Sequence, residues 1–346
     1  MTDLRTSYMG INLKNPIIVG ANHMVAKLDN LKRFEDAGAA AVVYKTLFEE
    51  QISLEKIQFQ NEWTDYDERG AEMVHIHPQI EHSGPAEHLF NLSRAKEALG
   101  IPLIASLNCV YQETWIEYAK EIAKTGVDGL EINFFAVPKD LQTDGSLMED
   151  MRVSILKEIK SVVNIPVSVK LSYFYTNPLN MVSKLADAGA DAFVLFNRLF
   201  EPEIDIETQS HVSTLKLSNE GDYRLSLRYI GMLFKNIQSS LCGNSGVFHG
   251  SDVIKLILAG ADCVQVVSVL YKSKPEHIKI MLEDMSNWMG RKSYNTINEF
   301  KGKLSKINTK DPFVYKRAQY IDINSKSPFM RRGSRLIPTI GHPNAP

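Results

Sequence analysis

A short phrase recurs four times along this chain, each time as the end of an amphipathic segment, a glycine and then an apolar run. The four copies read FEDAGAAAVVYKT, AKTGVDGLEINF, LADAGADAFVLFN and LILAGADCVQVVS. A helix often ends at a glycine because the residue after it adopts a left-handed conformation that side chains disfavour. The apolar runs that follow are too short for helices and rich in strand-forming residues. We therefore predict four helix–glycine–strand units, with the glycines at Gly38, Gly126, Gly189 and Gly260.

Four further apolar runs alternate with these units, and they read NPIIVGAN, GIPLIASLN, NIPVSVKLS and NIQSSLCGNSG. Together the runs predict eight strands, over residues 16–22, 40–46, 101–108, 129–135, 165–172, 192–198, 237–244 and 263–269, with helices such as 149–163 and 177–188 between most neighbours. Near-continuous apolar strands that alternate with helices form parallel sheets covered by helices. Eight units in 346 residues favour a closed (β/α)8 TIM barrel over an open doubly wound sheet, which has fewer strands.

The composition is that of a globular protein, with 44% apolar and 23% charged residues and a net charge of −2. The charge does not favour a polyanionic partner, and the apolar runs are shorter than a bilayer span. No apolar segment follows the initial MTDLRTSYMG, so we expect no signal peptide. Three cysteines without metal-ligand spacing are typical of a reducing compartment. We expect a cytoplasmic protein without a metal.

Polar side chains stand where each predicted strand ends, which is the face of a TIM barrel that carries chemistry. They are Asn22, Lys45, Ser106 with Asn108, Asn133, Lys170, Asn197 with Arg198, the run Gly243 to Gly246, and Ser268. One such residue alone often only bonds neighbouring backbone. Together, amides, two lysines and a glycine-containing turn before a helix suit a flat heteroaromatic ring with a phosphate. The run CGNSGVFHGSD follows strand seven, where barrel phosphate sites occur.

These motifs also carry a family resemblance. The runs LKNPIIVGAN, GLEINF, IPVSVKLS, AGADAFVLFNR and GNSGVFHGSDVIKLILAGADCVQVVSVLY, together with the Lys45 strand, resemble the FMN-dependent dihydroorotate dehydrogenases. The resemblance is nearest to the class 1 type and to a bacterial dihydroorotate dehydrogenase-like branch. It spans about residues 4 to 305 and implies an FMN-binding barrel over 1–305, a homodimer, and a basic C-terminal extension over 306–346.

The resemblance assigns roles residue by residue. Lys45 and Asn133 match positions beside the flavin and substrate, Lys170 the lysine at the flavin N1/O2 edge, and Asn197 an orotate-binding asparagine. The implied FMN-binding set is Gly20, Ala21, Lys45, Ser106, Asn108, Asn133, Lys170, Asn197, Asn244, Ser245, Gly246, Val267 and Ser268. The family usually has Gly-Gly where this chain has Ser245-Gly246, and Gly-Thr where it has Val267-Ser268.

The stretch LEINFFAVP departs most from the family. The family places a Cys or Ser base where this chain has Ala136, and an asparagine where it has Pro138. Removing a proton and a hydride from adjacent carbons needs a proton acceptor, and losing one costs roughly 10²–10⁴-fold in rate. The alternatives we weigh are Cys109, which we expect to be packed, Tyr173 and Tyr175, and the histidines of the long segment 47–93, namely His75, His77, His82 and His88.

Two segments lie outside the barrel pattern. The residues after strand six, FEPEIDIETQSHV onwards, alternate polar and apolar and predict a small hairpin at the barrel mouth. The tail from Lys301 is basic but interrupted by Pro and Ile, so we expect it to pack on the barrel or a partner rather than on nucleic acid.

We therefore expect an FMN oxidoreductase that oxidises dihydroorotate to orotate in pyrimidine biosynthesis. The alternatives are an FMN enzyme with a different small cyclic substrate, or a barrel that binds a flavin or phosphate ligand without the chemistry.

Overall fold

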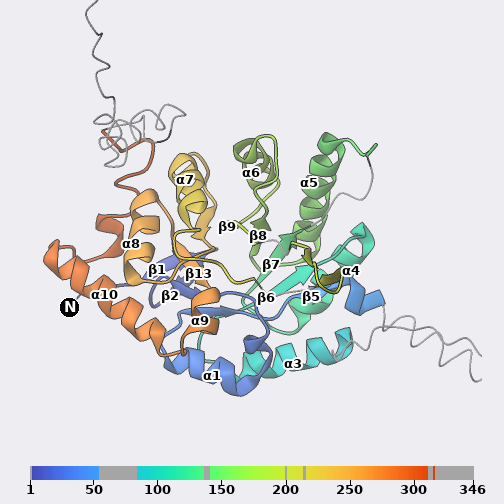
Figure 1. The fold of residues 1–346 in the computed structure, drawn as a ribbon, viewed down its shortest axis with the longest axis horizontal. Helices are drawn as coiled ribbons and strands as arrows, with labels where there is room; N and C mark the ends of the chain where they lie inside the picture. The colour runs from blue at the N-terminus through green and yellow to red at the C-terminus, as the bar shows by residue number, and fades with distance from the viewer. Residues whose placement is uncertain are drawn as a thin grey trace, which may run out of the picture.

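A closed parallel barrel forms the centre of the protein in a computed structural model that describes residues 2–53, 84–135, 141–198, 201–212, 216–310 and 315. Its eight strands, in order around the ring, are β3 (Ile17–Val19), β4 (Ala41–Val43), β6 (Leu103–Asn108), β7 (Gly129–Phe134), β8 (Val167–Leu171), β9 (Ala192–Leu195), β12 (Ser240–Gly243) and β13 (Cys263–Val266). Pairing of β3 with both β4 and β13, and of β4 with β6, closes the ring. The predicted (β/α)8 barrel and its eight strands are confirmed (Figure 1).

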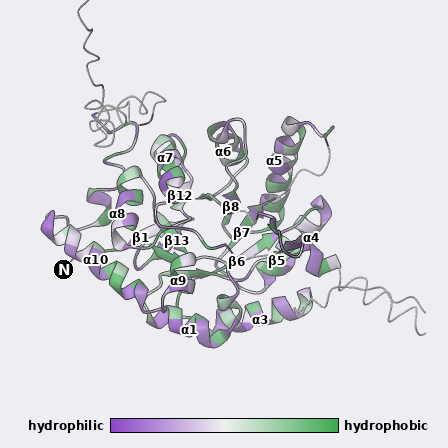
Figure 2. Cartoon of the chain, viewed as in Figure 1, coloured by the Kyte–Doolittle hydropathy of each residue, from purple (hydrophilic) through white to green (hydrophobic). Residues whose placement is uncertain are grey.

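Helices surround the barrel and lie between its strands in sequence (Figure 1). They are α1 (Leu28–Asp36), α3 (Pro85–Ala98), α4 (Gln112–Lys124), α5 (Gly145–Val162), α6 (Pro178–Asp187), α7 (Arg224–Leu233), α8 (Gly250–Ala259), α9 (Ser268–Lys272) and α10 (His277–Arg291). Each long helix buries an apolar stripe; α6, for example, buries Met181, Val182 and Leu185. The strands are almost wholly apolar, whereas the helices alternate between hydrophobic and hydrophilic residues (Figure 2). This pattern is expected when helices cover the outside of a buried sheet.

The four predicted glycines stand just after helix ends, and all have positive φ: 100° at Gly38, 81° at Gly126, 100° at Gly189 and 127° at Gly260. At Gly260, the amide donates to the carbonyls of Leu256 and Ile257 and so closes the last turn of α8. A side chain at this position would be strained by the backbone conformation. The glycine in each repeated phrase therefore marks the turn between a helix and the next strand.

A hairpin that we did not predict closes the amino-terminal end of the barrel. Strands β1 (Thr6–Tyr8) and β2 (Ile11–Leu13) pair antiparallel. The Met9 amide donates to Ser240 Oγ at the start of β12, 3.2 Å away. A Cβ added to Gly129, the first residue of β7, would lie 2.7 Å from Met9 Cε. The hairpin thus plugs the end of the barrel opposite the predicted site.

The remaining elements are short. β5 (Leu47–Phe48) continues the line of β4 and pairs with the end of β6. β10 (Glu203–Asp205) and β11 (Ser210–Val212) form the hairpin predicted after strand six. The 3-10 turns η1 (Met24–Ala26) and η2 (Ile297–Glu299) lie after β3 and α10. Of the helices described here, none has the length and apolar character needed to cross a membrane.

The start of the tail packs on the barrel helices. The Leu304 amide donates to the Leu258 carbonyl at the end of α8, and the Lys306 amide donates to the Gly231 carbonyl of α7. Tyr315 Oη donates to the Leu304 carbonyl at 2.5 Å. The other residues of the predicted extension, 311–314 and 316–346, lie outside the described residues.

Candidate active site

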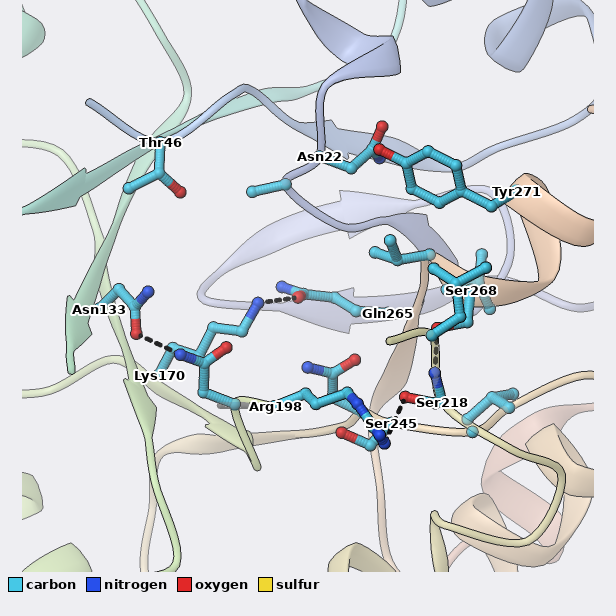
Figure 3. Close-up of a pocket in the computed structure, with 18 of the residues that line it drawn as sticks. Asn22, Thr46, Asn133, Lys170, Arg198, Ser218, Ser245, Gln265, Ser268 and Tyr271 are labelled. Carbon is cyan, nitrogen blue, oxygen red and sulfur yellow. Dashed lines mark hydrogen bonds between the residues drawn. The ribbon is translucent and has the colours of Figure 1, made fainter. Parts of the chain in front are cut away.

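A cavity of about 250 Å³ opens at the carboxyl ends of the barrel strands. Residues that follow six different strands line it, and its polar lining includes Asn22, Lys45, Asn133, Lys170, Asn197, Arg198, Asn244, Gln265 and Tyr271. Figure 3 shows Asn133 and Lys170 on one side of the cavity and Ser268 and Tyr271 on the other. No Asp or Glu is among the lining residues that the structure describes, whereas Lys45, Lys170, Arg198 and Lys216 are. Because a cavity wall that carries cations and no described carboxylate attracts anions, the cavity suits a negatively charged ligand.

An ion pair lies beneath the floor of this cavity. Lys170 of β8 is 8% exposed and its Nζ lies 3.5 Å from Oε1 of Glu131, which is 1% exposed. Gln265 of β13 accepts from Lys170 Nζ at 3.3 Å (Figure 3). It also donates through Nε2 to Glu131 Oε2 at 2.5 Å. A buried charge needs a partner of opposite sign and hydrogen bonds. Glu131 and Gln265, from two other strands, therefore hold the Lys170 ammonium in one place.

Two asparagines form the opposite wall. Asn197 Nδ2 donates to Asn133 Oδ1 at 3.1 Å, so the amides at the ends of β7 and β9 are joined (Figure 3). Asn108 stands behind them and donates through Nδ2 to the Asn133 carbonyl at 2.6 Å. An amide pair fixed in this way keeps one free donor or acceptor on each residue for a ligand. Such a pair recognises groups that donate and accept in one plane.

A turn rich in unpaired amides forms the other end of the cavity. After β12, Ser245 and Gly246 take positive φ of 70° and 66°. The backbone N–H groups of Ser245, Gly246, Val247, Val267 and Ser268 have no hydrogen-bond partner among the described residues. Consecutive N–H groups in such a conformation form a concave anion site. Nearby, the Ser218 amide donates to Ser268 Oγ at 2.9 Å, and Arg198 pairs with Asp222 at 3.0 Å.

Lys45 lies in a bulge between β4 and β5. Val43 is opposite Ile104, and Leu47 is opposite Leu107, so the chain takes one residue more than β6 over this stretch. A bulge turns a side chain away from the regular alternation of a strand and is frequent beside active sites. Burial lowers the pKa of the Lys45 ammonium below its ordinary value. The Thr46 hydroxyl, also at the cavity, is 2.9 Å from Ser106 Oγ.

Most residues expected from the resemblance line the cavity, and three do not. Those that line it are Ala21, Lys45, Asn133, Lys170, Asn197, Asn244, Ser245, Gly246, Val267 and Ser268. Ser106 and Asn108 are buried behind it, where they bond Thr46 and Asn133. Gly20 also lies behind the wall: a Cβ there would lie 2.8 Å from Val267 Cγ2, so glycine lets β3 approach the turn.

Several lining residues were not among our expected site residues. They are Asn22, His23, Thr46, Phe48, Phe135, Arg198, Lys216, Leu217, Ser218, Val247, Gln265, Val266 and Tyr271. Asn22 and Arg198 were predicted as polar strand-end residues, but the resemblance assigned them no role. Gln265 is the one polar residue inside the run CVQV of β13, and a buried polar residue within an apolar strand was a usable signal.

The alternative proton acceptors named above lie away from the cavity or outside the described residues. Tyr175 bonds Arg152 at 3.2 Å, and Tyr173 packs on Phe174. Ala136, Pro138, His75, His77 and His82 lie outside the described residues. Within the part of the chain described, no group of three His, Cys, Asp or Glu side chains could hold a metal ion.

Cys109 is packed rather than exposed to the cavity. It is 6% exposed, and burial, followed by the charge of Glu49, raises the pKa of its thiol well above the ordinary value. A thiol in this environment is a poor base. We expect Cys109→Ser to change the rate of any cavity chemistry less than threefold, about 0.6 kcal/mol, when single-turnover rates of the two proteins are compared. A loss of 100-fold would show that the thiol takes part.

His88 predicts a pH dependence of stability. Its ring packs edge-on against Tyr44, and burial, followed by the charge of Lys45, lowers its pKa to about 4. Because the unfolded chain binds this proton near pH 6.5, the stability is fully present above that pH and is lost as the pH falls toward 4. We expect the free energy of unfolding to drop by about 2 kcal/mol between pH 7 and pH 5 from this group.

Urea unfolding at both pH values checks this expectation against His88→Phe, which keeps an aromatic ring beside Tyr44. In the variant, the difference in the free energy of unfolding between pH 7 and pH 5 should be about 2 kcal/mol smaller than in the wild type. An unchanged difference would mean that His88 is not the residue responsible.

Comparison with known proteins gives a consistent result. The profile of the family described as dihydroorotate dehydrogenase matches residues 72–289. A protein of Thermoplasma volcanium named dihydroorotate dehydrogenase B (NAD(+)), catalytic subunit, is 30% identical over 312 residues, which cover 87% of this chain and 98% of that protein. Proteins of the same name from Thermoplasma acidophilum and Methanocaldococcus jannaschii are 26% and 24% identical, over 87% and 86% of this chain and 99% and 97% of their own lengths.

Proposed function

Because the chain belongs to the dihydroorotate dehydrogenase family, we propose that it is an FMN-dependent oxidoreductase that takes a hydride from a small anionic ring. The observation that carries the proposal is that one cavity joins a fixed lysine, an amide pair and a turn of unpaired N–H groups. Each is a separate requirement of a flavin site, and all three meet at the carboxyl end of the barrel.

The chain's residues fit FMN at two points. The amides of Ser245 to Val247, with those of Val267 and Ser268, would receive the phosphate, and the Ser245 and Ser268 hydroxyls lie beside them. This chain has Ser245-Gly246 and Val267-Ser268 where the family usually has Gly-Gly and Gly-Thr, and these replacements leave the backbone N–H donors in place. At the other end, Lys170 would face the ring with a charge that Glu131 and Gln265 hold in position.

FMN, when bound, supplies an acceptor for hydride. The part of this chain is to orient the ring, stabilise negative charge near Lys170 and exclude water with the apolar walls that Val247, Val266 and Phe135 provide. Asn133 and Asn197 would bind the substrate by their free amide groups. The cationic lining favours a substrate with a carboxylate, and dihydroorotate is the substrate that the relatives' name indicates.

The second candidate is an FMN enzyme that acts on a different small cyclic acid. One feature of the sequence supports this alternative. Ala136 and Pro138 replace the family's Cys or Ser base and its asparagine in the sequence, and neither side chain can hydrogen-bond a ligand. The homodimer implied by the resemblance also stays a prediction, which sedimentation at several concentrations would test.

Purification and anaerobic mixing test the proposal in two steps. The protein should be yellow, or become so with added FMN at one flavin per chain; a protein that cannot be loaded contradicts the flavin proposal. Dihydroorotate added without oxygen should then bleach the flavin absorbance. A loaded protein that dihydroorotate does not bleach would keep the flavin and exclude this substrate, so a series of other cyclic carboxylic acids would follow.

A further inference from the structure

The proposed oxidation needs a group that removes a proton, and this inference rests on that proposed function. Making a double bond by hydride loss requires that the neighbouring carbon give up a proton, and a positioned base accelerates that step. The residue must therefore line the cavity, reach the end where the amide pair lies, and be able to exist without its proton.

Few lining residues meet these conditions. Of those described, the ones with a titratable side chain are His23, Lys45, Lys170, Arg198, Lys216 and Tyr271. Lys170 is paired with Glu131 at 3.5 Å. Arg198 does not lose its proton in proteins and pairs with Asp222. These two are cations for binding rather than bases.

Three of the other four residues lie toward the turn of unpaired N–H groups after β12; they are His23, Lys216 and Tyr271. The His23 amide donates to Tyr271 Oη at 3.3 Å, and Figure 3 shows Tyr271 beside Ser268, across the cavity from Asn133. Lys216 is exposed and stands two residues before Ser218, which lies next to Ser245 in the same view. Only Lys45 of this set remains for the substrate end.

The backbone presents Lys45 at the right end of the cavity. Its bulge pairs on both sides with β6, the neighbour of the β7 strand that carries Asn133. Figure 3 shows Thr46, the next residue, on the same side of the cavity as Asn133. The bulge lies on the barrel wall and not on a long loop, so the position of the amine is limited by strand pairing.

The surroundings of Lys45 favour the neutral amine. It is partly buried and has no ion pair or hydrogen bond with a described residue. His88 from α3 and Tyr44 from its own strand stand behind it, and Lys170, Arg198 and Lys216 share the cavity wall with it. Glu49, the first carboxylate after Lys45 in the chain, accepts from the Thr114 hydroxyl at 3.0 Å, and Glu131 is paired with Lys170. Burial and cationic neighbours both favour loss of the proton from an amine.

We propose that the amine of Lys45 is the proton acceptor in the oxidation. The C–H bond next to the hydride-donating carbon breaks, its electron pair forms the second bond of the new C=C, and the hydride leaves to the flavin. The proton forms an N–H bond on Lys45, and solvent takes it after the product has left. In the reverse direction the ammonium donates the same proton.

The first test measures the proton affinity of Lys45 without substrate. Competitive acetylation of the FMN-loaded protein from pH 6 to pH 11, followed by mass spectrometry, gives a pKa for each lysine. Lys124, on the exposed side of α4, serves as the internal control. We expect Lys45 to titrate below Lys124, and a pKa equal to or above that of Lys124 would overturn the proposal.

The second test follows flavin bleaching by dihydroorotate in single turnover. Lys45→Met, measured at saturating FMN, should lose roughly 10²–10⁴-fold in the bleaching rate. Ethylamine in solution should raise the bleaching rate of Lys45→Met at least tenfold and leave the rate of the wild type unchanged. Lys124→Met is the control variant and should behave as the wild type.

Two results separate failure of this inference from failure of the proposed function. If Lys45→Arg bleaches at the wild-type rate, or Lys45→Met loses less than threefold, Lys45 acts by charge or not at all and the inference is wrong. If the loaded wild type is not bleached by dihydroorotate, the substrate is wrong, and the acetylation result still decides whether Lys45 has the chemistry of a base.

Discussion

We expect Lys170→Met to lower the free energy of unfolding by about 3–5 kcal/mol, because removing one partner of a buried ion pair leaves the other charge unpaired. Glu131 is 1% exposed, and within the described residues its remaining partner would be Gln265, at 2.5 Å. A carboxylate in this position must either stay charged without a cation or take up a proton. FMN affinity should fall as well, by more than tenfold, equal to about 1.4 kcal/mol.

A double variant provides the control for this prediction. Lys170→Met with Glu131→Gln carries no charge at these two positions, and its new amide can still accept from Gln265 Nε2. Urea unfolding should show that the double variant recovers at least half of the lost stability, whereas FMN binding stays weak. If Lys170→Met alone unfolds with the wild-type midpoint, the ion pair contributes nothing to the fold.

The barrel was predictable because its signals are local. Each repeated phrase contains its own helix end, its glycine and its strand, and the structure has positive φ at all four glycines. The pairing of neighbouring strands follows once alternating helices and strands are recognised, since parallel strands joined by helices have one favoured hand. Sequence order was therefore enough to place the polar strand ends at one face.

The features that could not be predicted depend on contacts between distant residues. Gln265 and Glu131 are 134 positions apart, and each taken alone is a polar residue in an apolar strand. Their bond exists because the ring brings β7 and β13 to face each other across its interior. The β1–β2 hairpin was missed for a similar reason: Met9 gains its burial from Gly129, a residue far along the chain.

The bulge at Lys45 shows a third limit. It is visible only as a change of register against β6, from Val43 opposite Ile104 to Leu47 opposite Leu107. A single extra residue in one strand has no composition signature, although it turns every following side chain to the other face. Lys45 could be predicted as a strand-end residue, but its orientation and surroundings required the partner strand.

In the turn after β12, Gly246 is the residue whose replacement should have the largest effect. Its φ is 66°, and a Cβ there would lie 2.4 Å from the Asn219 carbonyl oxygen and 2.7 Å from Asp222 Cβ. A left-handed conformation costs an alanine roughly 1–2 kcal/mol, and the two contacts add overpacking of about 1–3 kcal/mol. We expect Gly246→Ala to lower the free energy of unfolding by about 2–4 kcal/mol.

The same change should weaken FMN binding, because the turn must shift to relieve the contact with Asn219 and its unpaired amides move with it. Titration with FMN should give at least a tenfold weaker affinity, about 1.4 kcal/mol. Gly126→Ala is the matched control: its φ is 81° but nothing lies within 4 Å of the added Cβ, so it tests backbone strain alone. Its stability should fall by about 1 kcal/mol with unchanged FMN affinity. Equal losses in the two variants would mean that the contact with Asn219 is not what makes glycine necessary in this turn.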